Sequence, residues 1–219
     1  YQEFTKENPF VSPTLFITQT AETANLFLGF RGTIARNLSY NLKASVIQEE
    51  DKPLFLRNNS KSNGTTATSN NDAIKGYEYG NSFQVFYDDV KITSIFAELE
   101  YVLDKNLTFN TQFQYHNYTG TNTIEIWNLP NLEGSFTAVY KKEKWYANLT
   151  AFYQGERKDA LYNATYPSSL SSVQTLKAFV DVNLNGGYHF NDKFSAFLNI
   201  NNVLNTKYQR FANFNTQGF

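Results

Sequence analysis

Apolar and polar residues alternate along most of the chain, with a period of two positions rather than the helical period of about 3.6. The clearest stretch is 107–116, where Leu107, Phe109 and Phe113 fall on one side and Asn110 and Gln112 fall on the other. Successive side chains of a strand point to opposite faces of a sheet, so this stretch predicts a strand with one apolar and one polar face. The pattern therefore predicts an all-β protein.

About eight such segments recur, each about as long as the 9–11 residues that a tilted membrane-crossing strand needs. They cover residues 25–34, 39–46, 94–103 (preceded by a short stretch at 83–87), 107–116, 132–140, 145–153, 175–188 and 194–201. No window approaches the roughly 18 consecutive apolar residues of a membrane-spanning helix. A mean hydropathy of -0.48 still permits a membrane barrel, because each strand shows lipid only its alternate residues.

The connections between these segments alternate between short and long. Short turns are centred at Arg36, Lys105, Glu143 and Asp192, whereas polar loops occupy 49–82, 117–130 and 155–173. A soluble sandwich or a lipocalin-like barrel also has one dry and one wet face, but neither sorts its loops by length in this way. The pattern favours an antiparallel transmembrane β-barrel with short periplasmic turns and long extracellular loops, of which this chain supplies part of a larger barrel.

Aromatic residues gather beside the short turns, where a membrane barrel places an interfacial girdle. Ordinary packing of aromatic pairs across hairpins is the alternative reading. The residues concerned are Tyr40, Tyr101, Phe109, Tyr140, Trp145, Phe190 and Phe194. We expect the apolar row, including Phe109, Phe113, Leu149 and Leu198, to meet outer-membrane lipid. The opposite row is too polar to be buried dry and must meet water or another polar element.

Composition and charge remove other classes of function. A net charge of -1 with 18% charged residues argues against a nucleic-acid surface. The absence of Cys excludes disulfides and thiolate chemistry. The chain begins at Tyr1 with no recognisable secretory signal, so we expect any signal to lie outside this sequence or to have been removed.

Candidate catalytic and metal-binding residues are few. His116 and His189 fall on different strands without metal-site spacing, so neither a metal site nor histidine-based catalysis is favoured. The acidic runs Glu49-Glu50-Asp51 and Asp88-Asp89 could hold a divalent cation, but solvated loop charges are the favoured reading. We therefore expect no catalytic, cofactor-binding or metal-binding residue, no cofactor, and a protein that is not an enzyme.

Six charged residues are expected on the polar face of the strands. They could line a permeation path or pair across strands beneath a plug, and the sequence leaves both readings open. These residues are Arg31, Lys43, Glu98, Glu100, Lys177 and Asp181. The Asn-x-Thr triplets at Asn63, Asn117 and Asn163 are assigned no role, because a chain so rich in Asn and Thr produces them by chance.

The last 26 positions carry a family resemblance. Residues 194–219 contain a strand, then Asn201-Asn202-Val203-Leu204-Asn205-Thr206-Lys207-Tyr208, then Asn215-Thr216-Gln217-Gly218-Phe219. This order resembles the C-terminal end of TonB-dependent receptor barrels, and the Asn-rich loops resemble Bacteroidetes versions. The resemblance implies an outer-membrane receptor that takes up a ligand captured by extracellular loops at 58–72, 119–128 and 156–172.

The resemblance also sets the expected boundaries and partners. In that family one more strand follows the Gly, so we expect residues 1–219 to be an outer-membrane barrel domain truncated at both ends, with the plug domain and final strand outside it. TonB would then act through a segment not present in this sequence, and a surface lipoprotein or another outer-membrane subunit is a further expected partner. The alternative function is a plugless structural or partner-subunit barrel in an outer-membrane assembly. The ligand is not specified by the sequence.

Overall fold

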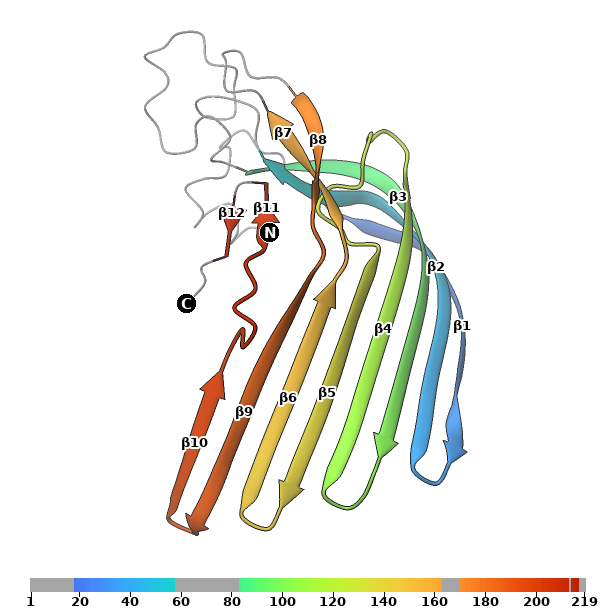
Figure 1. Cartoon of the computed structure of the whole chain (residues 1–219). Coiled ribbons are helices and arrows are strands. Elements are labelled where there is room, and N and C mark those ends of the chain that lie inside the picture. The colour runs from blue at the N-terminus through green and yellow to red at the C-terminus, as the bar shows by residue number, and fades with distance from the viewer. Residues whose placement is uncertain (1–17, 58–82, 163–169, 213, 217–219) are drawn as a thin grey trace, which may run out of the picture.

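The computed structural model describes residues 18–57, 83–162, 170–212 and 214–216. Eight antiparallel strands form one curved sheet in the order β1-β2-β3-β4-β5-β6-β9-β10, as Figure 1 shows. Every strand of this sheet neighbours the next one along the chain, apart from the step from β6 to β9. The described sheet is open, with β1 and β10 at its edges. The expected all-β, antiparallel fold of about eight strands is confirmed.

The strands belong to one large sheet and two small ones. The large sheet contains β1 (Ala21–Ala35), β2 (Leu38–Arg57), β3 (Phe83–Val102), β4 (Leu107–Gly120), β5 (Leu132–Lys142), β6 (Trp145–Gln154), β9 (Phe179–Asn191) and β10 (Phe194–Ile200). The two small antiparallel sheets are formed by β7 (Arg157–Tyr162) with β8 (Leu170–Leu176) and by β11 (Gln209–Phe211) with β12 (Phe214–Asn215).

The register of the sheet brings the predicted apolar rows together on one face. Leu42 lies opposite Ala97, Ala97 opposite Phe113, Phe113 opposite Gly134, and Gly134 opposite Tyr153. A slip of one residue at any strand would move its row to the other face. This face is exposed, with Phe113 at 44% and Leu198 at 61% of full accessibility. The alternation in the sequence therefore describes one continuous outer surface.

The four short turns lie where they were expected, all at the same end of the sheet (Figure 1). Side chains close two of them. The Asp104 carboxylate accepts hydrogen bonds from the backbone N–H groups of Asn106 at 2.6 Å and Leu107 at 3.0 Å. The Asn191 side-chain oxygen accepts from the N–H of Lys193 at 2.9 Å. Asp and Asn favour tight turns because their side chains satisfy the backbone two residues further on.

Aromatic rings pack in chains across the strands near this end. Tyr101 stacks on Phe109 with centroids 6.4 Å apart, and Trp145 lies 4.6 Å from Tyr188. Phe190 continues the second chain toward Phe194 at 5.0 Å. The rings thus contact one another across strands while sitting on the exposed apolar face. The positions of these rings fit both interpretations, because the rings pack across strands and also form a row near the short-turn end of the sheet.

The predicted loop at 49–82 is wrong in its first part. Residues 49–57 continue β2 and pair with β3, so that each of these strands is 20 residues long. A bulge between Glu49 and Lys52 interrupts the ladder, and Asp51 adopts a φ of 52° there. Residues 49–57 show no alternation in the sequence. Their backbone hydrogen bonds to β3 form the strand without a row of apolar side chains on the outer face. The predicted loop at 58–72 lies outside the described residues.

The predicted polar loop at 155–173 is also wrong within the described residues. β7 and β8 form a hairpin there, and the strand expected at 175–188 is broken at residues 177–178 between β8 and β9. The hairpin contacts β2 and β11, and Asp159 and Ala160 within it are fully buried. The sequence did not predict this strand pair, because the pair is held by tertiary contacts and has no exposed apolar row that would produce an alternating pattern. Within the described residues no helix is long and apolar enough to cross a membrane.

Candidate functional site

The inner face of the sheet carries networks of polar side chains. The Glu98 carboxylate accepts hydrogen bonds from Asn110 and Gln112, each at 3.0 Å, and from Asn41 at 3.5 Å. Three neighbouring strands are therefore joined at one carboxylate. Between β6, β9 and β10, the side chain of Asn148 bonds to that of Asn185, which in turn bonds to that of Asn199.

The six charged residues expected on the polar face have different surroundings. Glu98 pairs across strands, and the Lys43 ammonium lies 5.0 Å from the ring centre of Phe27. Arg31 and Glu100 lie in strands of the sheet. Lys177 was misplaced by the sequence reading, because it lies in the break between β8 and β9 and not within a strand. Asp181 lines a cavity.

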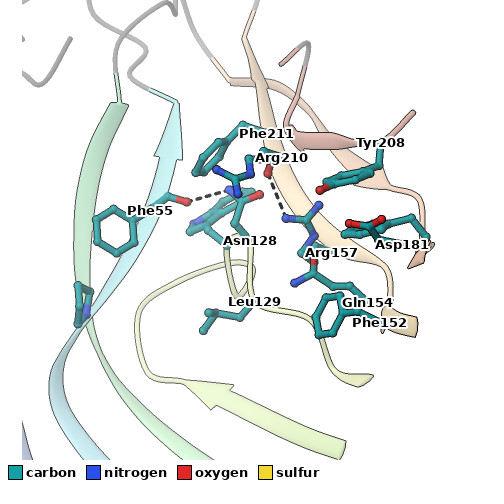
Figure 2. Close-up of a pocket in the computed structure, with 13 residues that line it drawn as sticks. Phe55, Asn128, Leu129, Phe152, Gln154, Arg157, Asp181, Tyr208, Arg210 and Phe211 are labelled. Atoms are coloured by element: carbon teal, nitrogen blue, oxygen red, sulfur yellow. Dashed lines mark hydrogen bonds between the residues drawn. The ribbon is translucent and has the colours of Figure 1, made fainter. Parts of the chain in front are cut away.

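This cavity, of about 430 Å³, is lined by residues at the loop end of the sheet, which is the end of the strands away from the short turns. Its walls come from β2, the 127–129 segment, β6, β7, β9 and the 208–211 segment. In Figure 2, Phe55 and Asn128 lie on one side, Asp181 and Tyr208 on the other, and Arg157 between them. The lining residues are Pro53, Phe55, Trp127, Asn128, Leu129, Phe152, Gln154, Arg157, Phe179, Asp181, Tyr208, Arg210 and Phe211.

A buried carboxylate next to the cavity ties three segments together. Asp159 is fully buried, and its oxygens accept hydrogen bonds from the Asn128 amide at 2.8 Å, the Ala160 N–H at 2.9 Å and the Ala212 N–H at 2.6 Å. The same Asn128 amide also donates to the Phe55 carbonyl at 2.8 Å (Figure 2). Asn128 makes this reach in a left-handed conformation with φ of 58°, which Asn tolerates better than most residues. The hydrogen bonds of Asp159 and Asn128 thus join the end of β2, the 127–129 segment and residues 209–212, which we call the C-terminal segment.

Arg157 fixes the C-terminal segment from the other side. Its two terminal nitrogens donate to the carbonyls of Gln209 at 2.6 Å and Arg210 at 3.1 Å. Figure 2 shows the second of these bonds. The side chain is only 7% exposed. Burial lowers the pKa of Arg157 from its ordinary value, although the Asp159 carboxylate works in the opposite direction. A buried guanidinium with carbonyl partners and a nearby carboxylate is an ordered part of the cavity wall rather than a surface charge.

Aromatic rings close the cavity beside Asp181. Phe179 and Tyr208 stack face to face with centroids 3.7 Å apart, and Phe152 contacts Phe179 at 6.4 Å. The motif that carries the family resemblance places Tyr208. Asn202 accepts a hydrogen bond from the Thr206 N–H at 2.8 Å and donates to the Thr206 carbonyl at 3.1 Å. Asn at this position therefore folds the chain back so that Tyr208 reaches Phe179.

Two residues of the acidic runs, Asp88 and Glu49, have polar partners within the described part of the chain. Asp88 is buried and accepts hydrogen bonds from the N–H groups of Asn122 at 3.0 Å and Thr123 at 2.9 Å. Burial by itself would raise the pKa of Asp88, but these N–H donors outweigh it and lower the pKa below its usual value. Glu49 pairs with Lys52. The described residues contain no group of three His, Asp or Glu side chains that could hold a metal ion. The favoured reading of solvated loop charges is therefore wrong for Asp88, which anchors the 121–123 segment.

The two histidines remain apart. His116 shares a hydrogen bond of 2.7 Å with the Ser94 hydroxyl, and its ring lies 5.4 Å from Tyr118. His189 packs against Tyr146 at 5.6 Å, near the short turns. Each histidine thus belongs to a local pair on the inner face, and nothing in the described part of the chain brings the two together.

Sequence reasoning missed most of this cavity. Asn128, Arg157 and Asp159 fell inside predicted loops, and Tyr208 was noticed only as part of a family motif. One signal was present in the sequence, because Arg157, Lys158 and Asp159 stand beside Ala160 and Leu161 in a short run of charged and then apolar residues. Such a run is too short to predict a strand without its partner.

No protein-family model matches the sequence, and no curated protein matches it. Solved structures match it by fold. The ferripyoverdine receptor of the outer membrane of Pseudomonas aeruginosa superposes with a TM-score of 0.61 and 19% identity, over 89% of this chain and 25% of that one. The ferric-catecholate import receptor of E. coli gives a TM-score of 0.56 and 11% identity, over 85% and 24% of the two chains.

The fold is that of outer-membrane receptor barrels. A third example, the ferric yersiniabactin uptake receptor of Yersinia pestis, matches with a TM-score of 0.55 and 10% identity over 85% of this chain and 25% of that one. The expected resemblance to TonB-dependent receptor barrels is thus confirmed at the level of fold. The chain spans about a quarter of the length of the receptors it matches.

Proposed function

We propose that this chain is part of an outer-membrane transport receptor that captures its ligand at the loop end of the barrel. The observation that carries the proposal is the cavity of about 430 Å³, which lies at that end and is walled by side chains from segments far apart in the chain. Ligand sites are usually concave, mainly apolar and furnished with a few placed polar groups, as this one is. The three receptors that share the fold are described as binding or importing ferric chelates.

The proposed location is the bacterial outer membrane. The continuous exposed apolar face would meet lipid, and the upper halves of β2 and β3 would extend beyond the membrane, because 20 residues exceed the roughly 9–11 that a crossing needs. The short turns would then face the periplasm and the cavity would face outside. The polar inner face would border the lumen.

The proposal extends to parts of the protein beyond this sequence. Residues 1–219 would be a barrel domain whose plug and final strand lie outside it, and TonB would contact the outside part. A surface lipoprotein or another outer-membrane subunit is a further proposed partner. Transport, rather than catalysis, is the proposed activity.

Orientation can be tested by labelling intact cells. Residues 1–219 contain no Cys, so a single cysteine introduced among them has no competitor within this part of the protein. Ile124 is 69% exposed at the loop end, whereas Lys105 lies in a short turn at the other end. A membrane-impermeant maleimide should label Ile124→Cys and spare Lys105→Cys until the outer membrane is opened. The reverse pattern would contradict the proposed topology.

Transport can be tested even while the ligand is unidentified. Solutes removed from the medium are compared between cells that carry the wild-type gene and cells that carry Gln154→Trp, which places a large ring in the cavity wall. At least one solute should be depleted by the wild type and spared by the variant, while Glu100→Gln, in β3 away from the cavity, should behave as wild type. Equal depletion by all three strains, with the correct labelling pattern, would favour the partner-subunit alternative.

A further inference from the structure

Among the residues that the structure describes, three polar atoms around the cavity are buried without a hydrogen-bond partner. They are the side-chain Oδ1 of Asn128, the Nε of Arg157 and the Oδ1 of Asp181. All three residues line the same cavity (Figure 2). Buried polar atoms are nearly always paired, and each unpaired one calls for an explanation. Three of them around one cavity indicate a site that a bound molecule completes.

The identity of each unpaired atom is fixed by its neighbours. Both hydrogens of the Asn128 amide are used, toward Phe55 and Asp159, so its remaining oxygen can act only as an acceptor. The two terminal nitrogens of Arg157 already bond to the carbonyls of Gln209 and Arg210, which leaves Nε–H as a donor. The Asp181 oxygen is a second acceptor. The unpaired atoms in the cavity wall are therefore two acceptors and one donor.

An amide group is the complement of this set. A primary carboxamide supplies one carbonyl oxygen and two N–H donors, and two peptide units supply both kinds of group as well. A carboxylate or phosphate ligand has no donor for Asn128 and would face the Asp181 charge. An ammonium ligand has no acceptor for Arg157.

The charges around the cavity also favour a neutral ligand. Arg157, Arg210 and Asp181 line the cavity, and the Asp159 carboxylate acts on Arg157 from behind the wall, so the formal charges of these four groups cancel. A ligand with a net charge would find no opposite net charge among these four groups. Burying an uncompensated charge is strongly unfavourable. The stacked rings of Phe179 and Tyr208 give the cavity an aromatic wall next to Asp181. Aromatic walls favour ligands that present a ring to them.

We propose that this cavity recognises a neutral ligand in which an amide group stands beside an aromatic ring, such as a peptide segment with an aromatic side chain. This inference rests on the proposed function, since it names the chemical class of ligand captured at the loop end.

The chain supplies its own reporter for a binding experiment. It has two tryptophans, and Trp127 lines the cavity while Trp145 begins β6 beside a short turn. In the full-length protein in detergent, with every tryptophan other than Trp127 replaced by Phe, the fluorescence reports the cavity alone. The neutral probe is N-acetylphenylalaninamide. Its matched partners are N-acetylphenylalanine, which is anionic, phenylalaninamide, which is cationic, and N-acetylglycinamide, which lacks the ring.

The neutral aromatic amide should change Trp127 emission saturably and bind about tenfold more tightly than each of the three partners, because each partner loses one complementary feature. Asp181→Ala should weaken the neutral probe by about tenfold and Arg157→Lys by a similar factor, since Lys keeps the charge but lacks Nε–H. Glu100→Gln is the control carboxylate in β3 and should leave binding unchanged.

Two results would overturn the inference. Tighter binding of a charged probe would show that the cavity selects for charge, and it would leave the proposed receptor function intact. No response to any probe, from a protein whose solute uptake depends on Gln154, would show that water completes the three atoms and that the ligand binds elsewhere. If wild-type cells and Gln154→Trp cells depleted the same solutes, the result would contradict the proposed transport function and would not bear on the class of ligand.

Discussion

The two ends of the sheet are built by different means. At the short-turn end, alternating residues form an apolar outer row and a polar inner row, and turns closed by Asp104 and Asn191 join the strands. At the loop end, the strands lose that alternation, and buried polar residues such as Asp159 and Arg157 hold separate segments together. Local pattern explains the first region, whereas long-range hydrogen bonds explain the second.

This difference indicates which end of the sheet can carry specificity for a ligand. A strand that must keep one apolar face has little freedom at its outward positions, because a polar residue there would be exposed on that face. The segments around the cavity have no such constraint, so their side chains are free to form hydrogen bonds and to line a ligand-sized space. Variants that perturb one end and spare the other can break or sharpen the comparison.

The largest effect is expected from Asp159→Ala. Removing this buried carboxylate leaves the Ala160 N–H, the Ala212 N–H and the Asn128 amide without their partner, which should cost about 4 kcal/mol locally. Amide hydrogen exchange should accelerate across the 209–212 segment and stay unchanged in the β3–β4 turn. Equal acceleration at both ends would mean that the two regions form one cooperative unit.

Leu149→Arg should come next, and it tests the other region. Leu149 lies in the outer row of β6, and a charge placed in lipid near the middle of a barrel costs about 2–4 kcal/mol. Denaturant unfolding in lipid bilayers measures the loss. Asn148→Arg, the adjacent position on the inner face, is the matched control and should cost no more than about 1 kcal/mol. If both variants lost the same stability, the outer row would not meet lipid.

Acidification should release the 121–123 segment. The folded state holds the pKa of Asp88 below its usual value, so its contribution is complete above that value, near about 3.9, and disappears as the pH falls through the lower folded value. Below about pH 4, exchange at the Asn122 and Thr123 amides should rise. Asp88→Ala should show fast exchange at every pH, and a pH step that persisted in this variant would assign the titration to another group.

The smallest single contribution is expected from the stacking of Tyr208 on Phe179, which Tyr208→Ala removes. Loss of the ring that stacks on Phe179 should cost about 1 kcal/mol beyond the loss of buried area. Tyr208→Phe keeps the ring and should be close to neutral. Thermal unfolding followed at the C-terminal segment distinguishes the two variants, and equal losses would point to the hydroxyl group instead.

The sequence anticipated the fold better than the site. All eight strands of the large sheet and the four short turns were found from alternation and turn residues, since neighbouring positions in the chain determine both. The extension of β2 past Glu49, the continuation of β4 to Gly120 within the predicted loop at 117–130, and the β7–β8 hairpin were missed. In those segments the strands pair without a long alternating row, and the short run at 157–161 is too brief to predict a strand from the sequence alone.

The residues of the cavity illustrate the same limit. Asp181 was expected on the polar face and does line the cavity. Asn128 and Arg157 come from segments read as loops, and Asp88 was read as a solvated charge although it is 2% exposed. Polarity alone cannot separate a solvated loop residue from a buried one with several hydrogen-bond partners.

By itself the sequence determined the two faces of the sheet, because a period of two fixes which side chains share a face once the chain is extended. It also determined the end at which the short turns lie. Only the tertiary structure decided that residues 53–55, 127–129, 154–157, 179–181 and 208–211 surround one cavity. Their meeting depends on strand register, on the bulge beside Asp51 and on the bonds of Asp159, which act between positions distant in the chain.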